Sequence, residues 1–158
     1  MTKNPSLYDP TSRSLPISLL QTRELIMEVV RPMLVRHSIT EQHWRVLRVI
    51  SEDVRLDAST VAARACLLAP SVTRIVRALE KRGFISSVRD VSDKRRTVLQ
   101  LTEAGDAFLE KVSPESAEIF AKLRRTVGAE RWEQLTTLLS DIRSDIQATD
   151  SDQSDAKP

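Results

Sequence analysis

The chain has little cysteine, little glycine and few aromatic residues, and each shortage excludes a class of protein. Its single cysteine, Cys66, rules out an intramolecular disulfide and any metal site built from several thiolates. Three glycines leave little material for a large sheet, and an aromatic content of 4% predicts an aliphatic core of packed helices. No apolar run is long enough to span a bilayer and no secretory signal is recognisable, so we expect a cytoplasmic protein without a membrane partner.

Residues that carry catalysis are also scarce. The chain has two histidines, no glycine-rich phosphate loop and no metal-ligand spacing, which argues against an enzyme. We therefore expect no catalytic residue, no metal and no cofactor. Cys66 lies in an apolar Ala-Cys-Leu-Leu run, which favours an inert buried thiol over a redox sensor.

The length of 158 residues is that of one domain. We expect a disordered tail over residues 1–14, a single domain over residues 15–148 and a disordered acidic tail over residues 149–158. There is no internal repeat.

Residues 69–82 predict a cationic, amphipathic helix. Pro70 suits its first turn, where the missing N–H costs no hydrogen bond, and Gly83 with Phe84 beyond it suits its carboxyl-terminal cap. The helix is about three turns long, a length that fits across the major groove of B-form DNA. Its apolar stripe has four members: Val72, Ile75, Val76 and Leu79.

A shorter helix is predicted just upstream, over residues 57–65, with Asp57 or Ser59 as its cap. Its inward residues are Val61, Ala62 and Ala65. Two short helices joined by about four residues, the second one cationic, are typical of a helix-turn-helix. An ordinary helical hairpin with a solvated cationic face remains the alternative for these two helices alone.

Residues 85–89 and 97–101 predict a β-hairpin directly after the cationic helix. Both segments are rich in β-branched residues, and the loop between them ends in three adjacent cations, residues 94–96. From Arg55 to Arg96, ten cations stand against four carboxylates, a net charge of +6 in a chain whose total is only +2. This distribution is typical of a phosphate-binding surface, and the segment predicts a winged helix that binds duplex DNA.

The wing resembles that of the MarR family of transcription regulators. Asp93-Lys94-Arg95, a strand, and then Leu101-Thr102 and Gly105 match the family pattern of an Asp-x-Arg loop, a strand and Leu-Thr-x-x-Gly. The likeness extends over nearly the whole chain. It implies a mainly α fold with a small β-hairpin wing, a winged helix-turn-helix over about residues 55–102, and a dimer formed through the amino-terminal and carboxyl-terminal helices.

Five segments are similar, more narrowly, to the branch of the family that regulates homoprotocatechuate (3,4-dihydroxyphenylacetate) degradation operons. They are residues 19–24, 31–32, 36–37, 40–45 and 64–66.

The predicted dimerisation helices occupy residues 15–36 and 103–148. The first has one apolar stripe, and Pro32 kinks it or marks its last turns. Near the end of the chain, apolar residues follow steps of three and four, which makes an a/d seam suited to a partner helix. The seam packs either within its own subunit or against a second copy, and the resemblance favours the second copy. The stripe is Leu19, Ile26, Val30 and Met33, and the seam is Trp132, Leu135, Leu139, Ile142 and Ile146.

Thr102 is predicted to cap the helix that follows the wing, with Glu103 in its first turn. Family members have a long connecting helix here. Ser113-Pro114-Glu115 departs from that pattern and reads as a stop and restart, by a kink or a break.

A dimer of this kind reads a palindromic operator with half-sites about 34 Å apart. We expect Arg74 and Arg77 to meet base edges or phosphates in the major groove, while Arg95 enters the minor groove and its neighbours hold phosphates. Asp93 orients Arg95 or braces the wing. The expected DNA contacts are Ser71, Thr73, Arg74, Arg77, Lys81, Asp93, Lys94, Arg95 and Arg96.

Arg23 is the anomaly of the first helix because its spacing places it on the apolar stripe. A buried cation needs a partner. Either Arg23 pairs with a carboxylate of the protein or lies at the rim of the stripe, or it binds the carboxylate of an aromatic acid. Within the family architecture four further residues are close enough to complete an effector pocket: His37, His43, Trp44 and Arg48.

The sequence thus predicts a repressor of an aromatic-acid catabolic operon that a small aromatic carboxylate releases from DNA. A MarR-type regulator of another regulon, such as oxidative or antibiotic stress, is the first alternative. A winged-helix protein-interaction module is the second, although such a module has no need of cations on both helix and wing.

Overall fold

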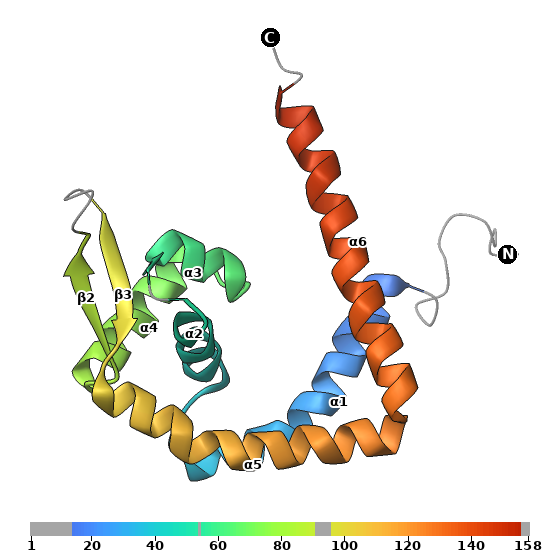
Figure 1. The fold of residues 1–158 in the computed structure, drawn as a ribbon, viewed down its shortest axis with the longest axis horizontal. Coiled ribbons are helices and arrows are strands. Elements are labelled where there is room, and N and C mark those ends of the chain that lie inside the picture. Colours follow the sequence, from blue (N-terminus) through green and yellow to red (C-terminus); the bar gives the residue numbers. More distant parts are fainter. Residues whose placement is uncertain (1–13, 54, 91–95, 156–158) are drawn as a thin grey trace, which may run out of the picture. The chain divides into compact units, whose positions relative to one another are not determined.

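The computed structural model describes residues 14–53, 55–90 and 96–155. The chain divides into two compact units, Met1–Ala117 and Glu118–Pro158, which are described separately. Figure 1 shows the elements in order: α1 (Leu15–Arg36), α2 (Glu41–Ser51), β1 (Leu56–Asp57), α3 (Ala58–Arg64), α4 (Ala69–Lys81), β2 (Ile85–Arg89), β3 (Thr97–Leu101), α5 (Glu103–Val127) and α6 (Ala129–Asp155).

The predicted helix-turn-helix is present as α3 and α4. All four residues of the α4 stripe are buried, and so are the three inward residues predicted for α3. Asp57, and not Ser59, caps α3, since its carboxylate accepts a hydrogen bond from the backbone N–H of Thr60 at 2.8 Å. Gly83 has a φ of 72°, and the amides of Gly83 and Phe84 donate to the carbonyls of Glu80 and Leu79, which confirms the predicted carboxyl-terminal cap.

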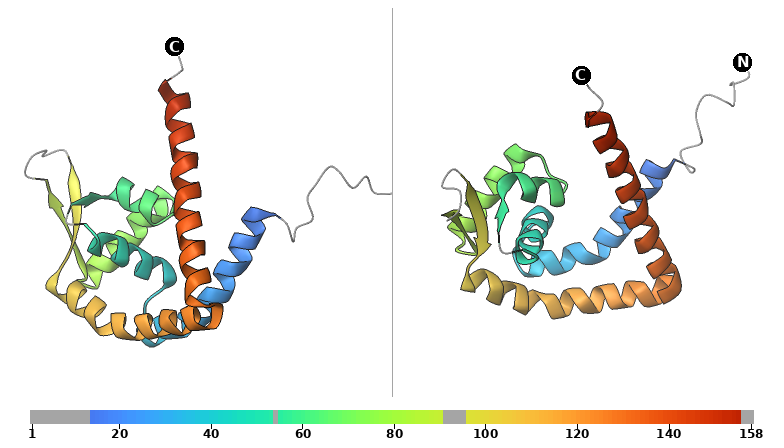
Figure 2. Two further views of the ribbon diagram at one scale, coloured as in Figure 1. Left: turned by 45° about the vertical axis from the view of Figure 1, so that its right-hand side comes forward. Right: turned by 45° about the horizontal axis from the view of Figure 1, so that its top comes forward.

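The predicted hairpin is the major part of a three-stranded antiparallel sheet with strand order β1-β3-β2. Strands β2 and β3 pair from Ile85 opposite Leu101 to Arg89 opposite Thr97. The two-residue strand β1 was not expected from the sequence, because so short a strand carries no periodicity of its own. Both views of Figure 2 show α2, α3 and α4 on one side of the sheet.

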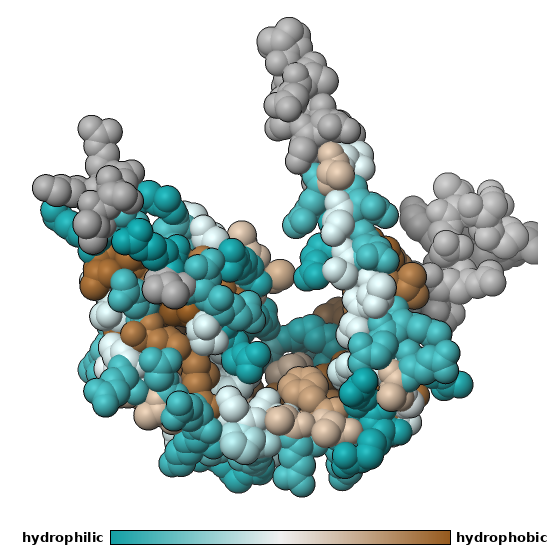
Figure 3. All heavy atoms as spheres, in the orientation of Figure 1, coloured by the Kyte–Doolittle hydropathy of each residue, from teal (hydrophilic) through white to brown (hydrophobic). Residues whose placement is uncertain are grey.

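The core of the first unit lies between these helices, the sheet and the second half of α1. It is aliphatic, as predicted, with Met33, Leu47 and Val61 fully buried. Figure 3 shows hydrophobic atoms within the sheet-containing unit, bordered by hydrophilic side chains. Only the end of the α1 stripe joins this core, because Val30 and Met33 are buried whereas Leu19 is exposed. Pro32 lies in the last turns of α1.

Helix α5 is continuous, so the expected break at Ser113-Pro114 is wrong. Pro114 lies inside α5 and is exposed. Its missing N–H leaves the carbonyl of Glu110 without an intrahelical partner, and on an exposed side of the helix water can satisfy that carbonyl. Thr102 caps α5 as predicted, because its hydroxyl accepts from the amide of Gly105 at 3.1 Å.

The second unit contains the end of α5 and the whole of α6, which are separated at Gly128. An ion pair of 2.6 Å joins Arg124 of α5 to Glu133 of α6. Helix α6 continues to Asp155, beyond the limit at residue 148 that the sequence predicted for the domain, because no glycine or proline interrupts it. None of the described helices is long and apolar enough to cross a membrane.

Candidate DNA-binding surface and ligand cavity

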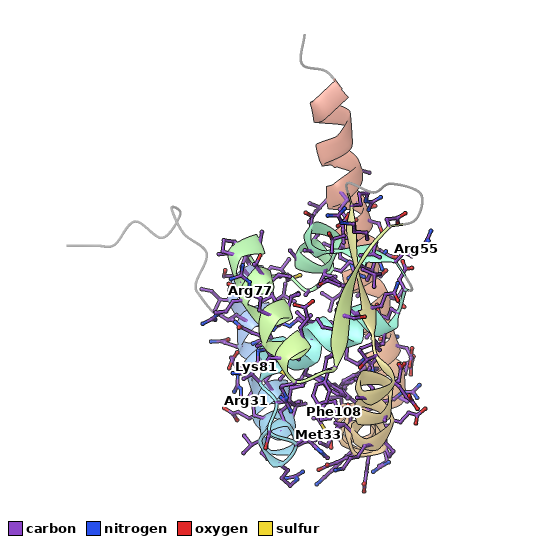
Figure 4. The ribbon with its side chains drawn as sticks, turned by 90° about the vertical axis from the view of Figure 1, so that its left-hand side faces the viewer. Arg31, Met33, Arg55, Arg77, Lys81 and Phe108 are labelled. Atoms are coloured by element: carbon purple, nitrogen blue, oxygen red, sulfur yellow. The ribbon has the colours of Figure 1, made fainter. Side chains whose placement is uncertain are left out.

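The outer side of α4 carries the cations that were predicted to meet DNA. Arg74, Arg77 and Lys81 are exposed, and none of them forms an ion pair with a described residue. Arg77 and Lys81 lie one turn apart along the same side of the helix (Figure 4). Thr73 is exposed too, with its hydroxyl donating to the carbonyl of Ala69 at 3.2 Å, and Ser71 is half-buried. This surface offers a row of guanidinium and ammonium groups to a polyanion.

The wing is described only in part. Asp93, Lys94 and Arg95 lie outside the described residues. Arg96 immediately precedes β3, and its guanidinium pairs with the carboxylate of Asp57 at 2.5 Å. Arg96, which was predicted to contact a phosphate, is thus paired with a carboxylate of the protein.

Asp57 joins the wing to the helix-turn-helix. Its carboxylate accepts from the amide and the hydroxyl of Thr60, each at 2.8 Å, and it pairs with Arg96. The hydrogen bonds from Thr60, with the Arg96 pair, lower the pKa of Asp57 from 3.8 to about 2. One ionised side chain therefore caps α3 and holds the base of the wing.

Because the pKa of Asp57 is depressed in the folded state, its contribution to stability is present above about pH 4 and is lost as the pH falls toward 2. We expect Asp57→Asn, which keeps a capping oxygen, to lower the free energy of unfolding at neutral pH by roughly 1 kcal/mol or less. The difference from wild type should shrink between pH 4 and 2. Urea titrations at each pH measure it, and a difference that does not change with pH would contradict this role of the carboxylate.

A cavity of about 650 Å³ lies beside α4. Residues of α1, the start of α2, the α3–α4 turn and α4 line it: Arg23, Thr40, Glu41, Gln42, His43, Arg45, Leu67, Arg74, Ile75 and Ala78. The volume is within the usual range for small-molecule sites. The structure thus brings together Arg23 and His43 of the predicted effector residues, and adds Arg74 from the predicted DNA-binding set.

A network of ion pairs forms one wall of this cavity. Glu41 pairs with Arg23, with Arg45 at 2.7 Å and with Arg31 at 3.7 Å. Glu24 pairs with Arg23 at 2.6 Å and with Arg31 at 2.5 Å, and these bonds lower the pKa of Glu24. The side chain of Arg23 is 41% exposed. Arg23 is therefore not buried on the apolar stripe, because the core does not cover that part of α1. Of the alternatives that the sequence left open, the structure shows the one in which Arg23 pairs with carboxylates of the protein.

His43 contributes a neutral imidazole to the cavity. Its partial burial, followed by the charges of Arg82 and Arg74, lowers its pKa. A neutral imidazole has one donor and one acceptor nitrogen, so it can bond a phenol without adding charge.

The other three predicted effector residues do not line this cavity. Trp44 is only 9% exposed and belongs to the core. Arg48, one turn further along α2, is exposed and forms no ion pair with a described residue. His37 is bonded to Glu115, with its Nε2 2.8 Å from the carboxylate.

Cys66 is exposed, so the predicted buried thiol is wrong. The backbone at Cys66 has a φ of 50°, which turns the chain between α3 and α4, and Ala65 takes the buried position instead.

Among the cavity residues that the sequence analysis did not assign to any site, Glu41 and Arg45 carry charge. They are four residues apart, the spacing of an ion pair on one helix face, and this was the available signal. Arg45 also donates to the carbonyl of Ala65 at 3.0 Å, so the network extends from α1 to the end of α3.

Comparisons with known proteins identify the family. A model described as the MarR family matches residues 39–97. The homoprotocatechuate degradative operon repressor of Escherichia coli is 36% identical over 129 residues, which cover 82% of this chain and 87% of the repressor. The chain belongs to the MarR family. Among solved MarR structures, NadR in complex with 4-hydroxyphenylacetate is 34% identical with a TM-score of 0.77, covering 85% of this chain and 96% of NadR.

A second MarR structure, the transcriptional repressor CouR bound to a 23-mer DNA duplex, has a TM-score of 0.75 over 90% of this chain and 98% of that one. Its sequence identity is 22%, so this likeness shows the MarR fold alone.

Proposed function

We propose that this protein is a dimeric DNA-binding repressor of an aromatic-acid catabolic operon, and that a small aromatic carboxylate weakens its hold on DNA. The identity to a homoprotocatechuate operon repressor and to the 4-hydroxyphenylacetate-binding NadR supports the effector class. The exposed cations of α4, which form no ion pair with a described residue, support the DNA-binding role. An enzymatic function is not part of the proposal, since the relatives act as regulators.

In this proposal α4 enters the major groove. Arg74 and Arg77, with Ser71 and Thr73, contact base edges or phosphates, and Lys81 contacts phosphates. The wing adds Arg95 in the minor groove, oriented by Asp93, with Lys94 and Arg96 on phosphates. Because Arg96 is already tied to Asp57, its phosphate contact also fixes the base of the wing to the DNA.

The dimer uses the apolar faces that the chain leaves exposed. Seam residues of α6 and the amino-terminal half of α1 are exposed in spite of their size: Leu15, Leu19, Leu20, Leu25, Leu135, Leu139, Ile142 and Ile146. Exposure of so many large aliphatic side chains is typical of an interface. A second copy of the chain packs against these faces and contributes the second winged helix that contacts DNA.

The observation that carries the effector proposal is the place of Arg74, which lies on the outer side of α4 and also lines the cavity. Arg23 and Arg45 are already paired with Glu41, whereas Arg74 has no ion-pair partner among the described residues. The effector carboxylate binds Arg74, its ring packs on Leu67, Ile75 and Ala78, and a phenol hydroxyl bonds His43. A carboxylate on Arg74 competes with DNA for the same guanidinium.

The test has two parts. Fluorescence anisotropy on DNA from upstream of the protein's own gene should show binding that weakens when 4-hydroxyphenylacetate or 3,4-dihydroxyphenylacetate is added. Calorimetric titration of the acids into DNA-free protein should show at least about tenfold weaker binding to Arg74→Ala, since a charge-assisted hydrogen bond is lost.

Arg48→Ala is the matched control, because it removes the same charge from an exposed residue outside the cavity. It should bind the acids as wild type does. If Arg48→Ala loses the acids while Arg74→Ala retains them, the effector lies on the Trp44 and Arg48 face of α2 and the cavity proposal is wrong. Absence of DNA binding at low salt would overturn the repressor proposal itself.

A further inference from the structure

Arg82 differs from the exposed cations Arg74, Arg77 and Lys81 of α4 because its guanidinium is bonded to the protein. It is the carboxyl-terminal cap residue of α4. It donates to the carbonyl of Ser38, in the turn between α1 and α2, at 2.8 Å. Its central carbon lies 4.6 Å from the centre of the Phe84 ring and 5.9 Å from that of Phe108. These distances are those of cation–π contacts.

The two phenylalanines continue this contact into α5. Phe84, just after α4, stacks on Phe108 of α5 with ring centres 4.6 Å apart and an angle of 24° between the planes. His37, at the end of α1, meets Phe108 edge-on at 6.4 Å and 88°. Figure 4 shows Phe108 pointing inward from α5. Such offset and edge-on arrangements are the favoured geometries of aromatic pairs.

An ion-paired carboxylate completes the cluster on the side of α1 and α5. Glu115 of α5 binds both Arg36 and His37, and these bonds lower its pKa, so that it is ionised at neutral pH. The end of α1 is therefore bonded to α5 through Glu115.

We propose that Arg82 and Phe108 are positioning residues for operator recognition: they fix the orientation of α4 relative to α1 and α5 and do not contact DNA. The inference rests on the proposed function, in which α4 reads the DNA. Helices of this class contact bases mainly through their amino-terminal residues, and Arg82 lies at the opposite end. In the proposed dimer, α1 and α5 connect α4 to the surface between the two copies. Their contacts with α4 therefore determine how the α4 helices of the two copies are oriented toward successive half-sites of the operator.

The experiment measures operator affinity as a function of salt for three variants. Arg82→Ala and Phe108→Leu should each bind about tenfold more weakly than wild type, with an unchanged slope of log affinity against log salt. Lys81→Ala is the matched control, an adjacent exposed cation whose loss should reduce that slope by about one. Phe108→Leu changes no charge, so the loss of a phosphate contact cannot explain its effect.

A second readout separates positioning from a general loss of stability. Insertion of one base pair between the half-sites should lower the operator affinity of wild type more than that of Phe108→Leu. A winged helix that is held less rigidly can adapt to the altered spacing. Phe108→Tyr keeps the stacked ring and should restore wild-type affinity and spacing preference. Phe108 is half-buried, so the added hydroxyl can reach solvent.

Three results would overturn the inference. Wild-type operator affinity in both Arg82→Ala and Phe108→Leu would remove the positioning role and leave the proposed function intact. A fall in salt slope for Arg82→Ala equal to that of Lys81→Ala would make Arg82 a phosphate contact. No operator binding by the wild-type protein would overturn the proposed function, and the inference with it.

Discussion

Replacing Gly105 by alanine is expected to destabilise the protein by about 1–3 kcal/mol, although helix propensity alone predicts a gain. A Cβ at Gly105 would lie 2.0 Å from the carbonyl oxygen of Phe84 and 3.2 Å from Leu101 Cδ2. The Phe84 carbonyl cannot move aside freely, because it accepts the amide of Thr102 at 3.1 Å. Thermal unfolding should show a fall of about 2–4 °C for each kcal/mol lost.

Ala104→Gly is the control for this substitution. Ala104 is exposed in the same turn of α5, so the change should cost only the ordinary propensity difference of about 0.5–1 kcal/mol. A melting temperature for Gly105→Ala that equals or exceeds that of wild type would show that the close approach of Phe84 to α5 is not required.

The same contacts give the Leu-Thr-x-x-Gly pattern a physical reason in this chain. Thr102 donates its hydroxyl to the carbonyl of Gly83 at 2.5 Å and accepts the amide of Gly105 with the same oxygen. Gly105 leaves room for the Phe84 backbone. In this chain the threonine and glycine of the motif therefore allow the segment after α4 to bond to the start of α5.

The helix-turn-helix and the hairpin could be predicted because their signals are local. The stripe of α4, its cap at Gly83 and the β-branched composition of β2 and β3 each follow from neighbours within a few residues, and the structure confirms the helix, its cap and the hairpin. The net charge of residues 55–96 likewise predicted a cationic surface on the winged helix.

The ligand cavity could not be predicted to the same extent because it depends on contacts between distant segments. Spacing placed Arg23 on an apolar stripe, but whether that part of α1 is covered depends on the rest of the fold, and Glu41 meets Arg23 from another helix. Spacing also gave no sign of the positive φ that exposes Cys66. The sequence counted Arg82 only in the net charge of the segment and gave no sign of its contacts, because its partners Ser38 and Phe108 lie far away along the chain.

Leu139→Glu is expected to separate the dimer and to weaken operator binding strongly. Leu139 lies at the middle of the α6 seam and is 37% exposed in the single chain. Full burial of a leucine contributes about 1.5–3 kcal/mol, and a symmetric interface loses it twice, so dimerisation should weaken by at least about 10²-fold. Light scattering should show half the mass of wild type at micromolar concentration, and anisotropy should show the loss of operator affinity.

Ser144→Glu tests whether the effect belongs to the seam and not to added charge. Ser144 lies on the opposite side of α6 from Leu139, Ile142 and Ile146, and its hydroxyl donates to the carbonyl of Ser140 at 3.1 Å. It should leave mass and operator affinity unchanged. If the seam packed only within its own subunit, Leu139→Glu would lower the melting temperature and leave the mass unchanged. A mass that halves without loss of helix content therefore identifies the seam as the surface between two copies. A parallel loss of operator affinity would show that both winged helices of the dimer are needed to bind the operator.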